Sequence, residues 1–192
     1  MTTGQLAWAR QARTTGPAGW PARQGGLASP MTSRSAVAER ATSTRSGLPA
    51  FKEFIAQYGE RLAGKVIVDP TNPIAPDGNG GFRKTIGEQE SSGQILAGLL
   101  RAGTPLVKAF GTLSADTLSA AARREPERAV LFYAADDDAA GNLIADLIRA
   151  DGYEPVRVGG LDQSIRLEVF GDLHEFGALG RVVTKSEALQ SI

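Results

Sequence analysis

Two short stretches of the sequence place polar or small residues directly after apolar runs. The first is Asp69-Pro70-Thr71-Asn72-Pro73, which follows the apolar run Val66-Ile67-Val68. Its two prolines stiffen the turn, so the Thr71 hydroxyl, the Asn72 amide and the local backbone can meet a ligand at little entropic cost. The simpler alternative is that Asp69 and Asn72 only cap this turn.

The second stretch is Val107-Lys108-Ala109-Phe110-Gly111-Thr112. Small residues at the end of a strand let a flat ring approach the backbone, although a buried strand entering an ordinary glycine turn has the same pattern. Lys108 interrupts an otherwise apolar run. Because a buried lysine needs a partner, we expect its ammonium to lie near the strand end, in a ligand-binding cleft.

Alternating strands and helices surround both stretches. Short apolar runs predict strands at 65–69, 105–110, 129–134 and 154–158. Helical spacing predicts helices over 49–62 and around 95–100, and another after the acidic triplet 136–138. A short helix that contains Leu118 and Ala121 is expected to be capped by Thr112 or Ser114, and a long loop runs from 70 to about 90. The stretch from Leu161 onward looks mostly helical. This alternation predicts an α/β fold with a mainly parallel sheet, in which ligands bind at the carboxyl ends of the strands.

The composition narrows the class of protein. The chain has 192 residues, is 42% hydrophobic and 22% charged, and has a formal net charge of zero. Nothing in these totals indicates a nucleic-acid or membrane partner, and no apolar run is long enough to span a bilayer. The chain has no cysteine, which excludes disulfides and thiolate metal sites and fits a cytoplasmic protein.

Residues 1–47 differ in chemistry from residues 48–192. The first segment carries six arginines, no lysine and one glutamate, a net charge of +5, whereas the second carries 15 basic and 20 acidic residues, a net charge of −5. The few large apolar residues of residues 1–47 show no helical or strand period, so we expect this first segment to be disordered. Three explanations stay open: a natural flexible tail, a transit-like leader, or a frame error or wrong start.

Together the two stretches carry a resemblance. Gly64–Pro73 followed by Val107–Thr112 resembles the deazaflavin (coenzyme F-420)-dependent NADP reductase family. The cytosolic domain of the six-transmembrane metalloreductases has the same pattern. The resemblance continues through Leu131–Asp137, Gly152–Val156 and Gly159-Gly160-Leu161, and it covers about residues 50–170.

The resemblance implies a Rossmann-like domain that passes a hydride between NADP(H) and a deazaflavin or flavin coenzyme. Such transfer needs positioning more than acid–base groups, so no catalytic side chain is demanded. The small-molecule coenzymes are the implied partners, with a possible homodimer. The residues that the resemblance assigns to coenzyme binding are Thr71, Asn72, Pro73, Lys108, Ala109 and Phe110.

Two departures from the family pattern matter. Gly111 stands where the family usually has asparagine, and the sequence has no GxGxxG loop to hold a pyrophosphate. We therefore expect residues 48–192 to form the C-terminal part of an incomplete Rossmann-like domain, with an exposed apolar edge beside the strand at 65–69 and weak or absent NADP binding. The alternative is a truncated or degenerate inactive fragment, or a non-enzymatic ligand-binding or interaction module.

Two charged features near the C-terminus have simpler explanations. His174 is the only histidine, and one histidine without a second nitrogen ligand makes a poor metal site, so we expect no metal and a structural role. Arg166 could face a phosphate, but a surface ion pair with Glu168 or Asp162 is the expected arrangement.

Overall fold

The structure is a computed structural model that describes residues 47–192. The expected disorder of the first segment lies outside these residues, apart from Gly47. The described residues divide into two units, one of residues 47–74 and 84–192 and a second that includes Ala75–Arg83. Within residues 47–192 the helices are too short or too polar for any of them to cross a membrane.

A four-stranded sheet forms the centre of the larger unit. Its order is β1 (Ile67–Asp69), β4 (Leu106–Lys108), β5 (Val130–Ala135) and β6 (Glu154–Arg157). β1 and β4 are parallel, as are β5 and β6, whereas β4 and β5 are antiparallel. The predicted α/β class and mostly parallel sheet are confirmed. The antiparallel pair has a consequence: the carboxyl ends of β1 and β4 lie at one end of the sheet, and those of β5 and β6 lie at the other.

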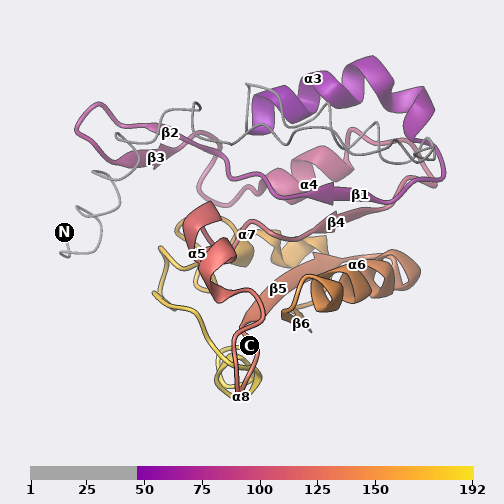
Figure 1. The fold of residues 1–192 in the computed structure, drawn as a ribbon. Coiled ribbons are helices and arrows are strands. Elements are labelled where there is room, and N and C mark those ends of the chain that lie inside the picture. Colours follow the sequence, from indigo (N-terminus) through magenta and orange to yellow (C-terminus); the bar gives the residue numbers. More distant parts are fainter. Residues whose placement is uncertain (1–46) are drawn as a thin grey trace, which may run out of the picture. The chain divides into compact units, whose positions relative to one another are not determined.

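Apolar side chains of alternating strand residues pack on the two faces of the sheet. Leu131, Tyr133 and Ala135 face α6 (Asp138–Ala150) and the residues around α5 (Ala115–Ala121). On the opposite face, Val130, Phe132 and Ala134 pack against the C-terminal segment. Beside them α3 (Leu48–Tyr58), η1 (Gly59–Leu62) and α4 (Ser92–Ala97) cover β1 and β4, as Figure 1 shows. Burial on both faces explains the continuous apolar run of β5.

Capping residues set the helix starts that the sequence predicted. Pro49 lies in the first turn of α3, where its missing N–H is tolerated. The Ser114 hydroxyl caps α5, and the Asp137 carboxylate accepts from Ala140 N at 2.8 Å to cap α6. Ser91 caps α4 in the same way, although the sequence predicted no cap for this helix.

The expected long loop from 70 to 90 contains a hairpin, so that prediction is wrong in part. β2 (Ile74–Pro76) pairs with β3 (Phe82–Lys84). The Asp77 carboxylate closes the turn by accepting from Asn79 N at 2.8 Å and Gly81 N at 2.9 Å. These backbone hydrogen bonds lower the pKa of Asp77. Strands of three residues interrupted by proline and glycine give too weak a period to be recognised in the sequence.

The stretch after Leu161 is less helical than expected. It contains η2 (Leu161–Gln163), α7 (Ser164–Leu167) and α8 (Lys185–Ala188), with irregular chain between the last two. Glycines explain the breaks. A side chain on Gly171 would place its Cβ 2.4 Å from the Ile165 carbonyl oxygen, and one on Gly177 would place its Cβ 1.7 Å from the Gly171 oxygen. The backbone therefore folds tightly on itself where a helix would need room for side chains.

Candidate functional site

A buried cluster of charges lies at the carboxyl ends of β1 and β4. The parallel register sets Asp69 beside Lys108, and Lys108 Nζ lies 2.8 Å from Asp69 Oδ2. Lys108 also donates to Ser92 Oγ at 2.7 Å and lies 3.3 Å from Glu168 Oε1. All four residues are 1% exposed or less. The expectation that the ammonium lies in a ligand-binding cleft is therefore wrong, because partners from three other elements hold it in the interior.

Glu168 is the member of this cluster that the sequence did not reveal. It caps the C-terminal end of α7 and accepts from Ser92 Oγ at 2.7 Å and Gly93 N at 3.2 Å. α4 and α7 pack closely here, since a Cβ on Gly93 would lie 2.3 Å from Ser164 Oγ. The predicted pairing of Arg166 with Glu168 or Asp162 is wrong. Arg166 instead lies 2.7 Å from Asp172, whose carboxylate raises the pKa of the guanidinium.

The Lys108 ammonium also reaches the turn after β1. It donates to the backbone oxygen of Thr71, and Asp69 Oδ1 accepts from Thr71 N at 2.8 Å. The Thr71 hydroxyl lies 3.4 Å from Ser92 Oγ, a weak hydrogen bond. The buried charges thus fix the start of the turn that the sequence singled out.

Asn72 ties this turn to two distant segments. Its Nδ2 donates to the Gly111 oxygen at 3.0 Å, and its Oδ1 accepts from Val169 N at 2.7 Å. Gly111 lies close to the turn, because a Cβ there would be 2.9 Å from the Pro70 oxygen. The absence of a side chain at Gly111, where the resembled family has asparagine, therefore permits the tight contact between the two strand-end turns.

The six residues predicted for coenzyme binding lie together but differ in access. Lys108, Ala109 and Pro73 are buried, whereas Thr71, Asn72 and Phe110 are half-buried. Asn72 uses both ends of its amide within the protein. Phe110 has a positive φ of 64° and packs in part against the core. Of the six, Thr71, Asn72 and Phe110 are therefore the residues that keep some exposed surface.

His174 has a structural environment. It is 2% exposed, its Nδ1 accepts from Phe176 N at 3.0 Å, and its ring lies 5.4 Å from the Phe176 ring. Burial lowers the pKa of His174 to about 4 against opposing contributions from Glu175 and Gly111. Among residues 47–192, no group of three or more histidine, cysteine or acidic residues could hold a metal.

The two turns leave a hydroxyl and an aromatic ring half-buried, at Thr71 and Phe110. Lys108, by contrast, is held inside the protein by Asp69 and Glu168. A surface cavity of about 480 Å³ lies elsewhere, lined by residues of α3 and η1 with Leu99 and Arg101, and includes none of the six predicted residues.

The sequence matches no protein-family model, and a search of curated proteins found no match. Eleven chains of known structure resemble this one. A hypothetical protein from Sinorhizobium meliloti is 22% identical with a TM-score of 0.64, over 78% of this chain and 70% of the other.

A protein from Arthrobacter sp. FB24, described as a proposed F-420-dependent NADP reductase, is 22% identical with a TM-score of 0.55. This match covers 67% of this chain and 60% of the other, so the chain spans about three fifths of that relative. At these identities the likenesses show a shared α/β fold.

Proposed function

We propose that residues 48–192 form the part of a Rossmann-like oxidoreductase domain that surrounds the nicotinamide of NADP(H), next to a deazaflavin or flavin coenzyme. The observation that carries the proposal is the pairing of two strand-end turns through Asn72 at the carboxyl ends of parallel β1 and β4. Open α/β sheets bind their ligands at such ends. The fold likeness to a proposed F-420-dependent NADP reductase supports it.

The residues divide into two roles under this proposal. Thr71 and Phe110 are half-buried and contact the nicotinamide ring. Asn72 and Lys108 hold the two turns in place through the hydrogen bonds described above. The bound coenzymes supply the hydride chemistry, and the protein supplies position and exclusion of water.

A second candidate function is a non-catalytic module or inactive fragment. The observation that favours it is the sequence itself, which has no GxGxxG loop for the pyrophosphate. Both candidates predict weak binding of the whole coenzyme by this chain. They differ in which part of NADP+ the protein contacts.

Saturation-transfer NMR with NADP+ separates the two candidates. For the 192-residue chain we expect a Kd weaker than about 10 μM, with the strongest transfer to the nicotinamide protons and weaker transfer to the adenine. Thr71→Val should weaken this transfer by removing the half-buried hydroxyl. Thr85→Val is the matched control, because the Thr85 side chain is exposed and its one link to the site, the backbone N–H that donates to the Pro73 oxygen at 2.8 Å, is kept by valine.

The competing outcomes are distinct. Transfer to the adenine alone, or none at millimolar NADP+, would rule out the nicotinamide site and favour the non-catalytic module. A Kd well below 10 μM would show that this chain binds the phosphates of NADP+ without a glycine-rich loop. That result would contradict the proposal that the chain contacts mainly the nicotinamide.

A further inference from the structure

The surface cavity beside α3, called the α3 cavity below, is built from two segments that each lead into a strand. Lys52, Ile55 and Ala56 lie at helical spacing on one face of α3, which continues into η1. Leu99 and Arg101, from the segment between α4 and β4, complete the lining. Since η1 precedes β1 and this second segment precedes β4, the cavity lies toward the amino ends of the two parallel strands. It is therefore separate from the turns that carry the proposed coenzyme site.

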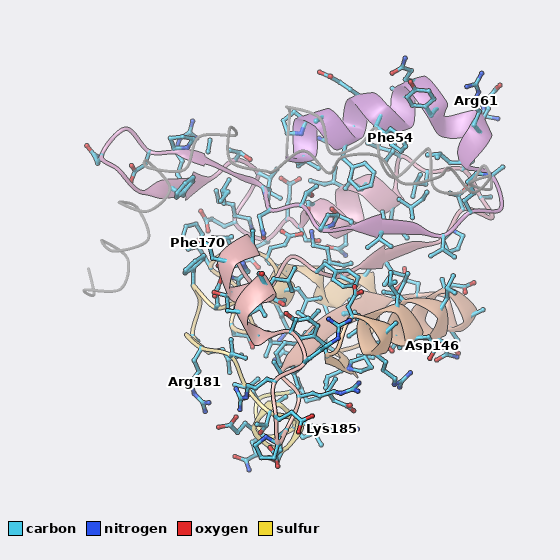
Figure 2. All side chains as sticks on the ribbon, viewed as in Figure 1. Phe54, Arg61, Asp146, Phe170, Arg181 and Lys185 are labelled. Atoms are coloured by element: carbon cyan, nitrogen blue, oxygen red, sulfur yellow. The ribbon has the colours of Figure 1, made fainter. Side chains whose placement is uncertain are left out.

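Positive charge dominates the α3 cavity. Its lining includes the cations Lys52, Arg61 and Arg101 and one acid, Glu60. Glu60 is already paired with Arg101 at 3.1 Å, whereas no carboxylate of residues 47–192 lies within ion-pairing distance of Lys52 or Arg61. Figure 2 shows Arg61 at the end of the segment formed by α3 and η1. Two uncompensated cations favour a ligand that carries an anionic oxygen group.

An apolar wall accompanies these charges. Ile55 is 5% exposed and Tyr58 is half-buried, with its ring centroid 5.2 Å from that of Phe54. Leu99 is 49% exposed and belongs to none of the apolar clusters of the described residues, although its neighbour Leu100 packs against one of them. An exposed leucine in a cavity of about 480 Å³ offers apolar surface for a ligand to cover.

We infer that the α3 cavity is a binding site for a small organic acid, a carboxylate attached to an apolar or aromatic body. The carboxylate pairs with Arg61, whose planar guanidinium can donate to both oxygens, and with Lys52. The body covers Leu99 and the Tyr58 ring. Because these cations are exposed and solvent-exposed ion pairs are weak by themselves, the affinity depends on both parts of the ligand.

The test compares three probes on the full 192-residue chain by ligand-observed NMR titration at about 150 mM salt. Phenylpropionate carries both parts of the ligand, phenylpropionamide keeps the ring but is neutral, and inorganic phosphate is an anion without an apolar body. We expect phenylpropionate to bind with a Kd below about 1 mM and the amide to bind at least about fivefold more weakly. Inorganic phosphate in about tenfold excess should not displace phenylpropionate.

Three variants locate the bound acid. Arg61→Gln should weaken phenylpropionate binding about five- to tenfold and leave the amide unaffected. Leu99→Ser should weaken the binding of both, because it removes apolar surface. Arg124→Gln is the matched control and should change neither, since Arg124 is exposed and outside the cavity. All three replaced side chains are exposed, so each Tm should stay within about 3 °C of the wild type.

Contrary outcomes would overturn the carboxylate site. Phenylpropionate that fails to bind up to about 10 mM, or that binds no better than its amide, would do so, as would displacement by inorganic phosphate. Equal affinity in Arg61→Gln and the control would place the acid elsewhere. Arg61 ends η1, where a cation also offsets the helix dipole, so a loss of binding accompanied by a larger fall in Tm would assign Arg61 a structural role. Each of these results leaves the nicotinamide site untouched, since saturation transfer from NADP+ tests that site separately.

Discussion

Lys108 is a buried cation whose neighbours carry two carboxylates. Asp69 Oδ2 lies 2.8 Å and Glu168 Oε1 3.3 Å from its ammonium, and these side chains are at most 2% exposed. Charges taken out of water are tolerated only when they are paired and hydrogen-bonded. Removing the single cation leaves two carboxylates facing one another without compensation.

Lys108→Met should therefore lower the free energy of unfolding by about 3–5 kcal/mol, measured by urea denaturation at pH 7. Lys185→Met is the matched control, since Lys185 pairs with Glu154 at 2.7 Å but the two side chains are 59% and 27% exposed. We expect a loss below about 1 kcal/mol for this surface pair. Similar losses in both variants would show that the buried cluster contributes no more than a surface ion pair.

His174 should make the free energy of unfolding decrease as the pH is lowered through a defined window. Burial lowers its pKa to about 4 in the folded protein, whereas the unfolded chain titrates near 6.5. Below pH 6.5 the unfolded state binds a proton that the folded state does not, so stability is lost as pH falls from 6.5 to 4 and the loss then stops.

Between pH 7.5 and pH 5 the expected loss is about 2 kcal/mol, measured by urea denaturation at both values. His174→Gln should remove most of this dependence. Glu187 also has a lowered pKa, to about 2, because its carboxylate accepts from the Thr184 backbone. Its contribution is lost only below pH 4.5, outside this window. A slope that persists in His174→Gln would assign the dependence to another group.

At the scale of the elements, the sequence predicted those whose pattern is local. The apolar runs located β1, β4, β5 and β6. The starts of α5 and α6 were predicted to within a few residues, at Thr112 or Ser114 and at the triplet 136–138, and the caps are Ser114 and Asp137. In each case the signal lies in neighbouring residues, as burial on both faces or as a cap. The predicted site residues did come together, since parallel strands bring their carboxyl ends to one end of the sheet.

What escaped prediction depends on contacts distant in sequence. Glu168 lies 60 positions from Lys108, and nothing near Glu168 distinguishes it from an exposed acid. The sequence around Asn72 indicates only a turn residue. In the structure its side-chain oxygen accepts from the backbone N–H of Val169, 97 positions away. The antiparallel pairing of β4 with β5 was not predicted either, because the strands are similarly apolar and their sequences do not show which strands pair or in which direction. Pairing partners and buried ion pairs are tertiary properties, so local pattern does not determine them.

At the scale of the whole molecule, β1 has a strand neighbour on one side only within residues 47–192. Ile67 N donates to the Pro105 oxygen at 2.9 Å and the Asp69 oxygen accepts from Ala109 N at 3.2 Å. Since bonding directions alternate along a strand, the N–H and C=O of Val68 point away from β4. An apolar strand with open backbone groups is a template for pairing with another chain.

We expect the purified chain to self-associate between roughly 1 μM and 1 mM, measured by sedimentation velocity. Val68→Lys should increase the monomer fraction, because a lysine on an edge strand opposes pairing with a second copy. Val68 is half-buried, and the lysine stem can cover the same apolar surface while the ammonium reaches water. Ile192→Lys adds the same charge at an exposed terminal position and should leave association unchanged. A wild-type chain that stays monomeric over this range and unfolds cooperatively would show that the β1 edge is already covered.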